Sequence, residues 1–345
     1  MRFWEIVQKH TISLDGNQRL LLKKWLAKWS NLIMKKKKKI LITGISGQDA
    51  SLIIDKLKGS HCWEIYGISH NKDITHDSKT NNFEIYNWDF VDQHKIDEIV
   101  KRIQPDVFIN LASFSSGIGM FENTAQLSQV NGMSVIFMLE SIRHFSPKTL
   151  FLQAGSSEMF GNTPDYPQTE ESPMLPRTPY GAAKLFAHNN VRIYRQKYKL
   201  LLNNMILYNH ESIYRRDIFV SKKIVKSAVA IKNGNNKKLQ LINLDSARDW
   251  SYAPDFVDAM FLIIDQVKSS DYIFSSGKLT TVRELCEIVF SYLDLDYNFY
   301  VEELDTKIEL SNNLLGNPNK LEDLGFKRTK DVKEFMIEMT ENELN

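Results

Sequence analysis

Short apolar runs alternate with helical patterns along most of this chain. From Lys38 onward, the apolar runs predict strands at 40–43, 64–69, 84–88, 107–111, 150–154, 204–208 and 272–275. The periodic stretches between them predict helices at 50–58, 96–103, 126–144 and 180–198. Strands that are apolar almost throughout, and that alternate with helices, are typical of a parallel sheet covered on both faces. We therefore expect an α/β fold built on a Rossmann-type, doubly wound parallel sheet.

The pattern loosens after about residue 210. Helical segments recur at 219–233, 255–268, 282–293 and 331–343, with loops between them. They predict a smaller, mostly helical lobe at the carboxyl ends of the strands, where open α/β sheets bind their ligands. We accordingly divide the chain into a dinucleotide-binding domain at 34–208 and a mainly substrate-binding lobe at 209–345. The second part is expected to return one strand, at about 272–275, to the sheet.

The first 33 residues carry a different pattern. Apolar side chains at Leu22, Trp25 and Trp29 have the spacing of an amphipathic helix, and the lysines beside them would let such a helix lie on a membrane surface. The alternative is that Met34, followed by a lysine run and the first strand, is the natural start. We favour this alternative and expect 1–33 to be a non-catalytic extension.

Composition limits the classes of partner. A formal net charge of +2 over 345 residues gives no reason to expect nucleic acid, and no apolar run approaches the roughly 20 residues of a membrane span. Two cysteines cannot build a disulfide framework, and the eight histidines form no metal-binding pair on a helix. We expect a cytoplasmic protein without a metal, without membrane contact and without a nucleic-acid partner.

A glycine motif follows the first strand. In "ITGISGQDA" (42–50), Gly44 and Gly47 suit a tight turn and a close backbone approach to a pyrophosphate, before a helix N-terminus. The motif predicts a dinucleotide cofactor. The choice between NADP and NAD stays open. At the usual place after the second strand, "GISHNKD" (67–73) offers neither an arginine for a 2′-phosphate nor an acidic residue for a 2′-hydroxyl. Asp89, at the end of the third strand, is placed to meet the adenine.

Two further motifs carry the chemistry. "YGAAK" places Tyr180 and Lys184 one helical turn apart, on one face. A tyrosine has an ordinary pKa of about 10, and a lysine ammonium together with a positive nicotinamide would favour its phenolate. "QAGSSEMFG" (153–161) follows a buried strand and places Ser156 where it can hydrogen-bond the same substrate oxygen as Tyr180. Glu158 then puts a carboxylate at the mouth of the sheet, where it can serve as a base.

These motifs resemble the active centre of the extended short-chain dehydrogenase/reductase superfamily. Further stretches, in order along the chain from Lys38, extend the resemblance to the GDP-mannose 4,6-dehydratase family. They are "NHES" (209–212), "FVSKKI" (219–224), "LDSARDW" (244–250), "TVREL" (281–285) and "LLGNPNK" (314–320). The resemblance implies a lyase that converts GDP-mannose, or a related GDP-sugar, to the 4-keto-6-deoxy sugar. Hydride would move internally through a bound nicotinamide cofactor, with NADP expected and NAD as the alternative.

The resemblance also implies roles for individual residues. The catalytic group would be Ser156, where the family usually has threonine, together with Glu158, Tyr180 and Lys184. Cofactor contacts would come from Gly44, Ile45, Ser46, Gly47, Gln48, Asp49, Asp89, Phe90, Leu111, Ala112, Ser113, Ser115, Tyr180, Lys184, His210 and Arg215. Substrate contacts would come from Ser156, Asn209, Lys223 and Arg248. Relatives pair through the helices that correspond to 126–144 and 180–198, which implies a homodimer or homotetramer.

Several departures from the family pattern leave the substrate open. The paired arginines after the second strand are absent, and the Arg-Pro…Glu segment that grips the nucleotide reads "KIELSN" (307–312) here. The loop after "NHES" reads "IYRRDI" (213–218) in place of Pro-Arg-Arg-Gly, and the family histidine near Ser116 is missing. Two alternatives therefore remain at this stage. One is an epimerase, reductase or decarboxylase of the same fold, and the other is a non-catalytic nucleotide-binding homologue.

Overall fold

A computed structural model describes residues 24, 37–71, 83–114, 121–235, 237–304 and 314–345. The expected extension at 1–33 therefore lies outside the described residues, apart from Lys24. Within the described ranges, no helix combines the length and apolar character needed to cross a membrane. The same ranges contain no group of three or more acidic, histidine or cysteine side chains arranged to hold a metal ion.

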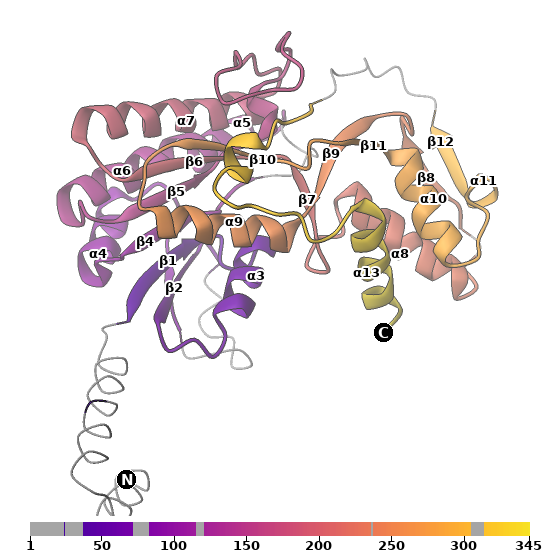
Figure 1. The fold of residues 1–345 in the computed structure, drawn as a ribbon, viewed down its shortest axis with the longest axis horizontal. Helices are drawn as coiled ribbons and strands as arrows, with labels where there is room; N and C mark the ends of the chain where they lie inside the picture. Colours follow the sequence, from indigo (N-terminus) through magenta and orange to yellow (C-terminus); the bar gives the residue numbers. More distant parts are fainter. Residues whose placement is uncertain (1–23, 25–36, 72–82, 115–120, 236, 305–313) are drawn as a thin grey trace, which may run out of the picture.

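The seven predicted strands form one sheet in which every pairing is parallel, and this confirms the predicted Rossmann-type fold (Figure 1). The strands are β1 (Lys38–Thr43), β2 (Trp63–Ser69), β3 (Glu84–Asn87), β4 (Val107–Asn110), β5 (Leu150–Ala154), β6 (Leu202–Leu207) and β10 (Asp271–Phe274). Their order across the sheet is β10-β6-β5-β4-β1-β2-β3. From β1 the chain first adds β2 and β3 on one side, and then adds β4, β5 and β6 on the other. The strand order therefore reverses between β1 and β4. Open α/β sheets bind ligands outside the carboxyl ends of the strands at such a switch point.

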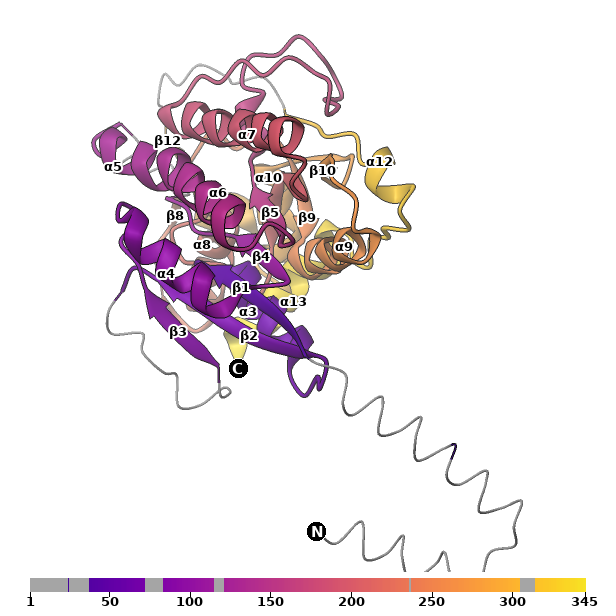
Figure 2. The ribbon, with the colours of Figure 1, turned by 90° about the vertical axis from the view of Figure 1, so that its left-hand side faces the viewer.

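Helices cover both faces of the sheet (Figures 1 and 2). On one face lie α3 (Gln48–Leu57) and α9 (Ala253–Gln266), which share an apolar core with the strands. On the other face lie α4 (Gln93–Ile103), α6 (Ser134–Phe145) and α7 (Pro179–Tyr198), which share a second core. Successive strand side chains point to opposite faces, so strands such as β1, β4 and β5 contribute to both cores.

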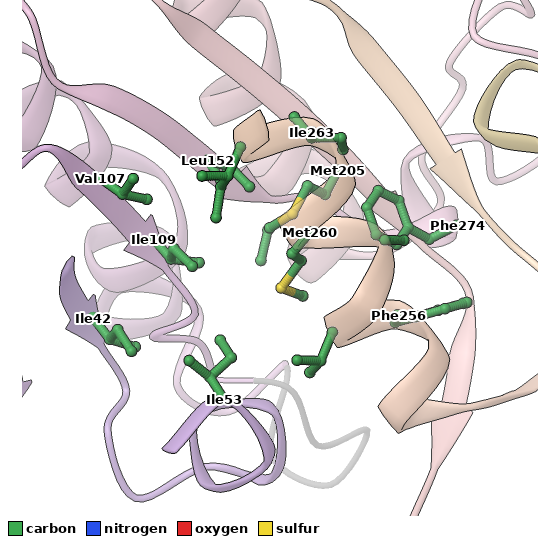
Figure 3. Close-up of a cluster of buried hydrophobic side chains, with 14 of the residues drawn as sticks. Ile42, Ile53, Val107, Ile109, Leu152, Met205, Phe256, Met260, Ile263 and Phe274 are labelled. Atoms are coloured by element: carbon green, nitrogen blue, oxygen red, sulfur yellow. The ribbon is translucent and has the colours of Figure 1, made fainter. Parts of the chain in front are cut away.

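Helix α9 packs on the sheet, although its periodic pattern was assigned to the smaller lobe. Figure 3 shows Phe256, Met260 and Ile263 of this helix near the strand side chains Leu152 and Met205, and all five are at most 1% exposed. Burying one such side chain contributes about 1.5–3 kcal/mol. The second half of the chain thus returns a helix as well as the strand β10 to the sheet. The expectation of one returning strand was incomplete, because an amphipathic pattern does not say which element covers the apolar face.

The rest of the C-terminal half forms a second body, at the right of Figure 1. Helices α8 (Val220–Lys232), α10 (Val282–Tyr292) and α13 (Val332–Leu344) share a third apolar core, with the short helix α11 (Tyr297–Tyr300) beside it. Five short strands there were not predicted: β7 (Asn209–Glu211), β8 (Leu239–Ile242), β9 (Ala247–Tyr252), β11 (Leu279–Thr281) and β12 (Val301–Leu304). They form two small sheets, with orders β11-β9-β7 and β12-β8. A further short helix, α12 (Asn319–Glu322), lies against β10.

The helix predicted at 126–144 is interrupted by a π-helical turn. Helix α5 (Thr124–Ser128), the turn η1 (Gln129–Met133) and α6 follow one another directly. Gly132 of the turn lies against α7, where an added Cβ would come within 3.3 Å of Phe186. Asn131 holds the loop after β4, because its side chain accepts from Phe114 N at 2.9 Å and donates to Phe114 O at 3.1 Å. The turn therefore combines close helix packing with a fixed loop beside the cavity described next.

Candidate active site

A cavity of about 1010 Å³ lies at the carboxyl ends of the strands and is lined by both halves of the chain. It brings together most residues that the sequence assigned to a site. They are Gly44, Ser46, Gly47, Gln48, Asp49, Asp89, Phe90, Leu111, Ala112, Ser113, Ser156, Glu158, Tyr180, Lys184, Asn209, His210 and Arg215. Three other assigned residues, Ile45, Lys223 and Arg248, do not line it. Ser115 lies outside the described residues.

The glycine turn between β1 and α3 has the geometry that its sequence predicts. Gly44 has φ of 69°, and an added Cβ would lie 2.9 Å from Ala112 N, so only glycine fits there. Gly47 caps α3 without a side-chain hydrogen bond, which leaves the first-turn amides of the helix free for an anion. Ile45 turns inward, since a Cβ added at Gly67 would lie 2.7 Å from its side chain. The turn fits the pyrophosphate of a dinucleotide through backbone groups.

An ion pair joins this turn to the second half of the chain. His210 Nε2 lies 3.1 Å from both carboxylate oxygens of Asp49, and His210 Nδ1 lies 2.7 Å from Tyr208 O. Burial opposes both charges, yet the pairing prevails: the pKa of Asp49 is lowered and that of His210 is raised. Gln48 adds hydrogen bonds to His210 O at 3.1 Å and from Ser212 Oγ at 2.9 Å. The negative charge of Asp49 is thus compensated where a phosphate would bind.

The short helix η2 (Ser157–Met159) sets the catalytic candidates side by side. Ser156 caps it, with its hydroxyl accepting from Glu158 N at 3.2 Å. The start of α7 packs tightly on this helix, because a Cβ added at Gly181 would lie 2.5 Å from Glu158 O. The glycine in "YGAAK" therefore has a steric reason, and it brings Tyr180 beside Ser156.

Two serine hydroxyls lower the pKa of Tyr180, which burial raises. Burial, the largest influence, raises the pKa of Tyr180, while hydrogen bonding to Ser156 and Ser113 lowers it and the charge of Glu158 raises it further. The Ser113 hydroxyl is buried and makes no hydrogen bond of normal geometry among the described residues, so its influence on Tyr180 comes from proximity. The net shift is upward, so the expected lowering of this pKa by Lys184 stays a prediction that also requires the positive nicotinamide. The sequence assigned Ser113 to the cofactor and did not foresee its place beside Tyr180.

Lys184 is held in the interior by one backbone contact. Its ammonium donates to Ala154 O at 2.8 Å and lies 5.8 Å from the centre of the Tyr180 ring. The side chain is 2% exposed, and burial lowers the pKa of Lys184 to about 8. An ammonium has three donors, so two remain for groups in the cavity.

A second ion pair shapes the loop after β7. Arg215 Nε lies 3.0 Å from Glu211 Oε2, and its guanidinium carbon lies 3.6 Å from the centre of the Phe219 ring. Glu211 is fully buried, which raises its pKa, and it accepts a short hydrogen bond from Ser221. Much of the positive charge of Arg215 is therefore already paired within the protein.

Two predicted substrate contacts lie outside the cavity lining. Arg248 Nη1 donates to Ala247 O at 2.8 Å, and burial lowers the pKa of the guanidinium while the nearby charge of Glu158 raises it. This side chain is thus within electrostatic reach of the Glu158 carboxylate. Lys223 is exposed and donates to Gln240 O at 2.8 Å. A ligand at Lys223 would have to extend beyond the main cavity.

The other end of the cavity lies at β2 and β3. Asp89 accepts from Val91 N at 3.0 Å, and the buried Phe90 has φ of 66°. His70, exposed at the end of β2, also lines the cavity. Lys72 lies outside the described residues. The described part of this loop therefore offers an imidazole but no arginine to a 2′-phosphate.

Several lining residues were not assigned from the sequence. Phe114, Asn123, Gln126, Leu127 and Val130 line one wall, and Arg216, Ile218 and Phe219 line another. Most of them carry no reactive group, so no chemical pattern marks them. Arg216 could have been assigned from the sequence, because it follows Arg215 in the loop that departs from the family pattern.

Comparison with known proteins agrees with this arrangement. The GDP-mannose 4,6 dehydratase family matches residues 41–343. GDP-mannose 4,6 dehydratase 2 of Arabidopsis thaliana is 34% identical over 337 residues, covering 92% of this chain and 90% of that protein.

Two solved structures share the fold at low sequence identity. RMD from Pseudomonas aeruginosa, complexed with NADPH, has a TM-score of 0.77 and 19% identity, covering 89% of this chain and 99% of its own. The dTDP-glucose 4,6-dehydratase of Bacillus anthracis, in complex with NAD, has a TM-score of 0.76 and 18% identity, covering 88% of this chain and 96% of its own. Because the family match spans most of the sequence and a relative exceeds 30% identity, this chain belongs to the GDP-mannose 4,6-dehydratase family.

Proposed function

We propose that the protein is a hydro-lyase that converts GDP-mannose, or a related GDP-sugar, to the 4-keto-6-deoxy sugar. One observation carries this proposal: Ser156, Glu158, Tyr180 and Lys184 line the same cavity as the glycine turn. A base, a hydroxyl, a carboxylate and an ammonium therefore surround one site, next to a turn that fits a pyrophosphate. Family membership supports the same activity, since the relatives that match are named GDP-mannose 4,6-dehydratases.

A nicotinamide cofactor would lie along the cavity from the β2 end to Lys184. The first-turn amides of α3, after Gly44 and Gly47, would hold its pyrophosphate, and Lys184 would hold its ribose. When bound, the nicotinamide supplies a hydride acceptor and, later, a hydride donor, so the reaction consumes no cofactor. The neighbouring structures were solved with NADPH and with NAD, which supports a nicotinamide cofactor of either kind.

The chain's own residues would move the protons. Tyr180, as a phenolate, removes the proton of the sugar C4 hydroxyl, while Ser156 donates a hydrogen bond to that oxygen. Oxidation at C4 makes the C5 proton acidic. Glu158 takes this proton and passes it to the C6 hydroxyl, which leaves as water. Once C6 is reduced, Tyr180 returns its proton to C5, so the net change is the loss of one water.

The nucleotide end of the substrate would lie toward the second body. Asn209 lines the cavity, Arg248 lies within electrostatic reach of Glu158, and Lys223 lies beyond the main cavity. These positions support contacts of Arg248 and Lys223 with phosphates or ribose. They also support a division of labour in which 34–208 carries the cofactor and the catalytic groups, and 209–345 mainly carries the substrate.

The Glu158→Gln variant tests the reaction class. Without the carboxylate, C5 proton transfer is lost, and formation of the 4-keto-6-deoxy product should fall by roughly 10² to 10⁴. Product formation from GDP-mannose is measured with the cofactor absorbance recorded throughout. A variant that keeps most of its turnover points to an epimerase, reductase or decarboxylase. Steady accumulation of reduced cofactor in the wild-type protein contradicts the internal return of hydride. Tight cofactor binding without turnover of any nucleotide sugar indicates a non-catalytic homologue.

We propose NADP as the preferred cofactor, with weak discrimination against NAD. A 2′-phosphate binds best to a free arginine fork, but Arg215 is already paired with Glu211 at 3.0 Å, and the described loop after β2 offers only His70. No acidic side chain at the end of β2 repels the phosphate either. Titration of cofactor-stripped protein with both dinucleotides should show less than a tenfold preference. A preference for NAD above about tenfold, roughly 1.4 kcal/mol, contradicts the proposal.

A further inference from the structure

A row of polar side chains crosses the middle of the central sheet. Thr43, Asn110 and Gln153 occupy the same level of β1, β4 and β5, as register partners of one another. The row continues as Asn204 on β6 and Asp271 on β10. In-register neighbours in a parallel sheet point to the same face, and here that face carries α6 and α7. The first three side chains are at most 1% exposed.

Hydrogen bonds connect the first three members in one direction. Thr43 Oγ1 accepts from the amides of Leu111 and Ala112, both at 3.1 Å, so its hydroxyl proton is left to donate to Asn110 Oδ1 at 2.5 Å. Asn110 Nδ2 then donates to Gln153 Oε1 at 2.8 Å. The backbone amides at one end thereby fix the orientation of both side-chain amides.

The chain of hydrogen bonds ends at the candidate catalytic lysine. Gln153 Nε2 donates to Ala154 O at 2.9 Å, the same carbonyl oxygen that accepts from Lys184 Nζ at 2.8 Å. The other half of the row also holds α7. Asn204 donates to His188 O at 3.2 Å, one turn after Lys184, and to Asp271 Oδ1 at 2.9 Å.

Polar side chains are a costly way to fill a sheet core. An unpaired buried amide costs about 1–3 kcal/mol, and apolar side chains of similar volume would stabilise the core without that risk. In the row below, Leu41, Phe108 and Phe151 on the same three strands are apolar and fully buried. Packing alone therefore does not account for the polar row.

We propose that Thr43, Asn110 and Gln153 are positioning residues that fix the Ala154 carbonyl and, through it, the Lys184 ammonium. This inference rests on the proposed role of Lys184 in the dehydratase reaction. None of the three contacts Lys184 directly, and the effect passes through Ala154 O. The donor from Gln153 competes with Lys184 for that oxygen, which keeps the ammonium available to the cavity.

Two single variants and their combination test the relay. In Gln153→Met the competing donor is gone, and in Asn110→Leu the partner that orients Gln153 is gone. Each variant should lower kcat about tenfold while KM for the nucleotide sugar stays near the wild-type value, because the proposed nucleotide contacts lie on other elements. In a relay both changes break the same connection, so the double variant should be scarcely worse than either single one.

A measurement without turnover completes the test. The rate at which acetic anhydride labels Lys184, followed by mass spectrometry against pH, gives the midpoint of its titration. Loss of the competing donor in Gln153→Met, or of the partner that orients it in Asn110→Leu, lets Ala154 O bind the ammonium better, so the midpoint should rise in both single variants. Asn203→Leu serves as control, because Asn203 is a fully buried amide on the same strand as Asn204, outside the row.

The outcomes separate this inference from the proposed function. A wild-type kcat and midpoint in Asn110→Leu, or effects that multiply in the double variant, overturn the relay. A similar fall in kcat and shift of the midpoint in Asn203→Leu also overturn it, since any lost amide would then suffice. If the wild-type protein turns over no nucleotide sugar, the proposed function fails, while the labelling midpoints still decide the relay.

Discussion

At the scale of single residues, the active-site cluster shows how burial and hydroxyl groups oppose each other. Burial raises the pKa of Tyr180 and lowers that of Lys184, so both shifts favour the neutral forms. The hydroxyls of Ser156 and Ser113, and more weakly the charge of Arg215, act in the direction that a tyrosine base requires. The protein alone thus holds Tyr180 as a phenol.

Replacing Ser113 should make Tyr180 a poorer base. In Ser113→Ala one hydroxyl that lowers the tyrosine pKa is lost, so the acidic limb of the kcat–pH profile should move to higher pH. At neutral pH we expect a loss of a few-fold, comparable to one hydrogen bond of about 1 kcal/mol. Ser134→Ala is a matched control, because its buried hydroxyl donates to Val130 O in the adjoining π-helical turn and not to the active-site cluster. An unchanged acidic limb in Ser113→Ala contradicts the assignment.

At the scale of elements, the sequence predicted the strands and helices that have a regular apolar pattern. It missed the helical irregularity and the short strands that have no such pattern of their own. Long apolar strands such as β5 (Leu150–Ala154) and the periodic helix α7 (Pro179–Tyr198) were placed within two residues. The π-turn at Gln129–Met133 was missed, because it has the same apolar period as its neighbours and differs only by an inserted residue. The short strands β7 and β11 were missed because they depend on pairing with β9, to which distant segments contribute.

In the candidate site, too, the residues that belong to a sequence pattern were predicted and the others were not. Residues in motifs, such as Gly44, Glu158 and Tyr180, were predicted because their types and spacing reflect chemistry. The wall formed by Phe114 and Val130 was not, because its residues are ordinary and only the fold brings them to the cavity. The ion pair of Asp49 with His210 was predicted only in part. Both residues were assigned to the cofactor, but their contact joins positions 161 residues apart.

The ion pair of Asp49 on α3 with His210 on β7 should make the free energy of unfolding depend on pH. The folded pKa of His210 is above 6.5 and that of Asp49 is below 3.8. The pair therefore stabilises the fold fully between these values, and this stability is lost as pH rises through the folded pKa of His210. Urea unfolding of wild type and Asp49→Asn should give a larger difference in the free energy of unfolding at pH 6 than at pH 9.

A surface pair on the same helix provides the control for this experiment. Lys56 and Asp258 join α3 to α9 at 2.7 Å, with side chains 40% and 57% exposed. Such a pair contributes at most about 1 kcal/mol, and neither partner is a histidine. Asp258→Asn should therefore change stability little and equally at both pH values. A pH-independent difference for Asp49→Asn removes the case for a charged pair.

At the scale of the whole molecule, α7 has one face too apolar for solvent. Phe186 is 42% exposed and Ile193, two turns further along the same face of this helix, is 55% exposed. The opposite face of α7 packs on the sheet with Ala187 and Val191. We propose that the exposed face meets a second copy of the chain across a twofold axis, together with α6.

A single charge should separate the copies. In Ile193→Glu, a carboxylate would be buried in the interface without a partner, so sedimentation at micromolar concentration should show monomers where wild type shows dimers or tetramers. Phe299→Glu is the control, since Phe299 is 64% exposed on the other body and lies away from α7. A monomeric wild-type protein contradicts the proposed assembly.

The return of α9 and β10 to the sheet has a consequence for how the chain folds during its synthesis. The strands from β1 to β6 and the helix α3 emerge first from the ribosome, but Leu152 and Met205 share their core with Phe256 and Met260, which are made later. Until residue 274 has emerged, the apolar part of this face that α9 covers stays exposed, and the β6 edge stays open to pairing with other chains. We therefore expect the nascent protein to be prone to aggregation over the span in which the second body is made.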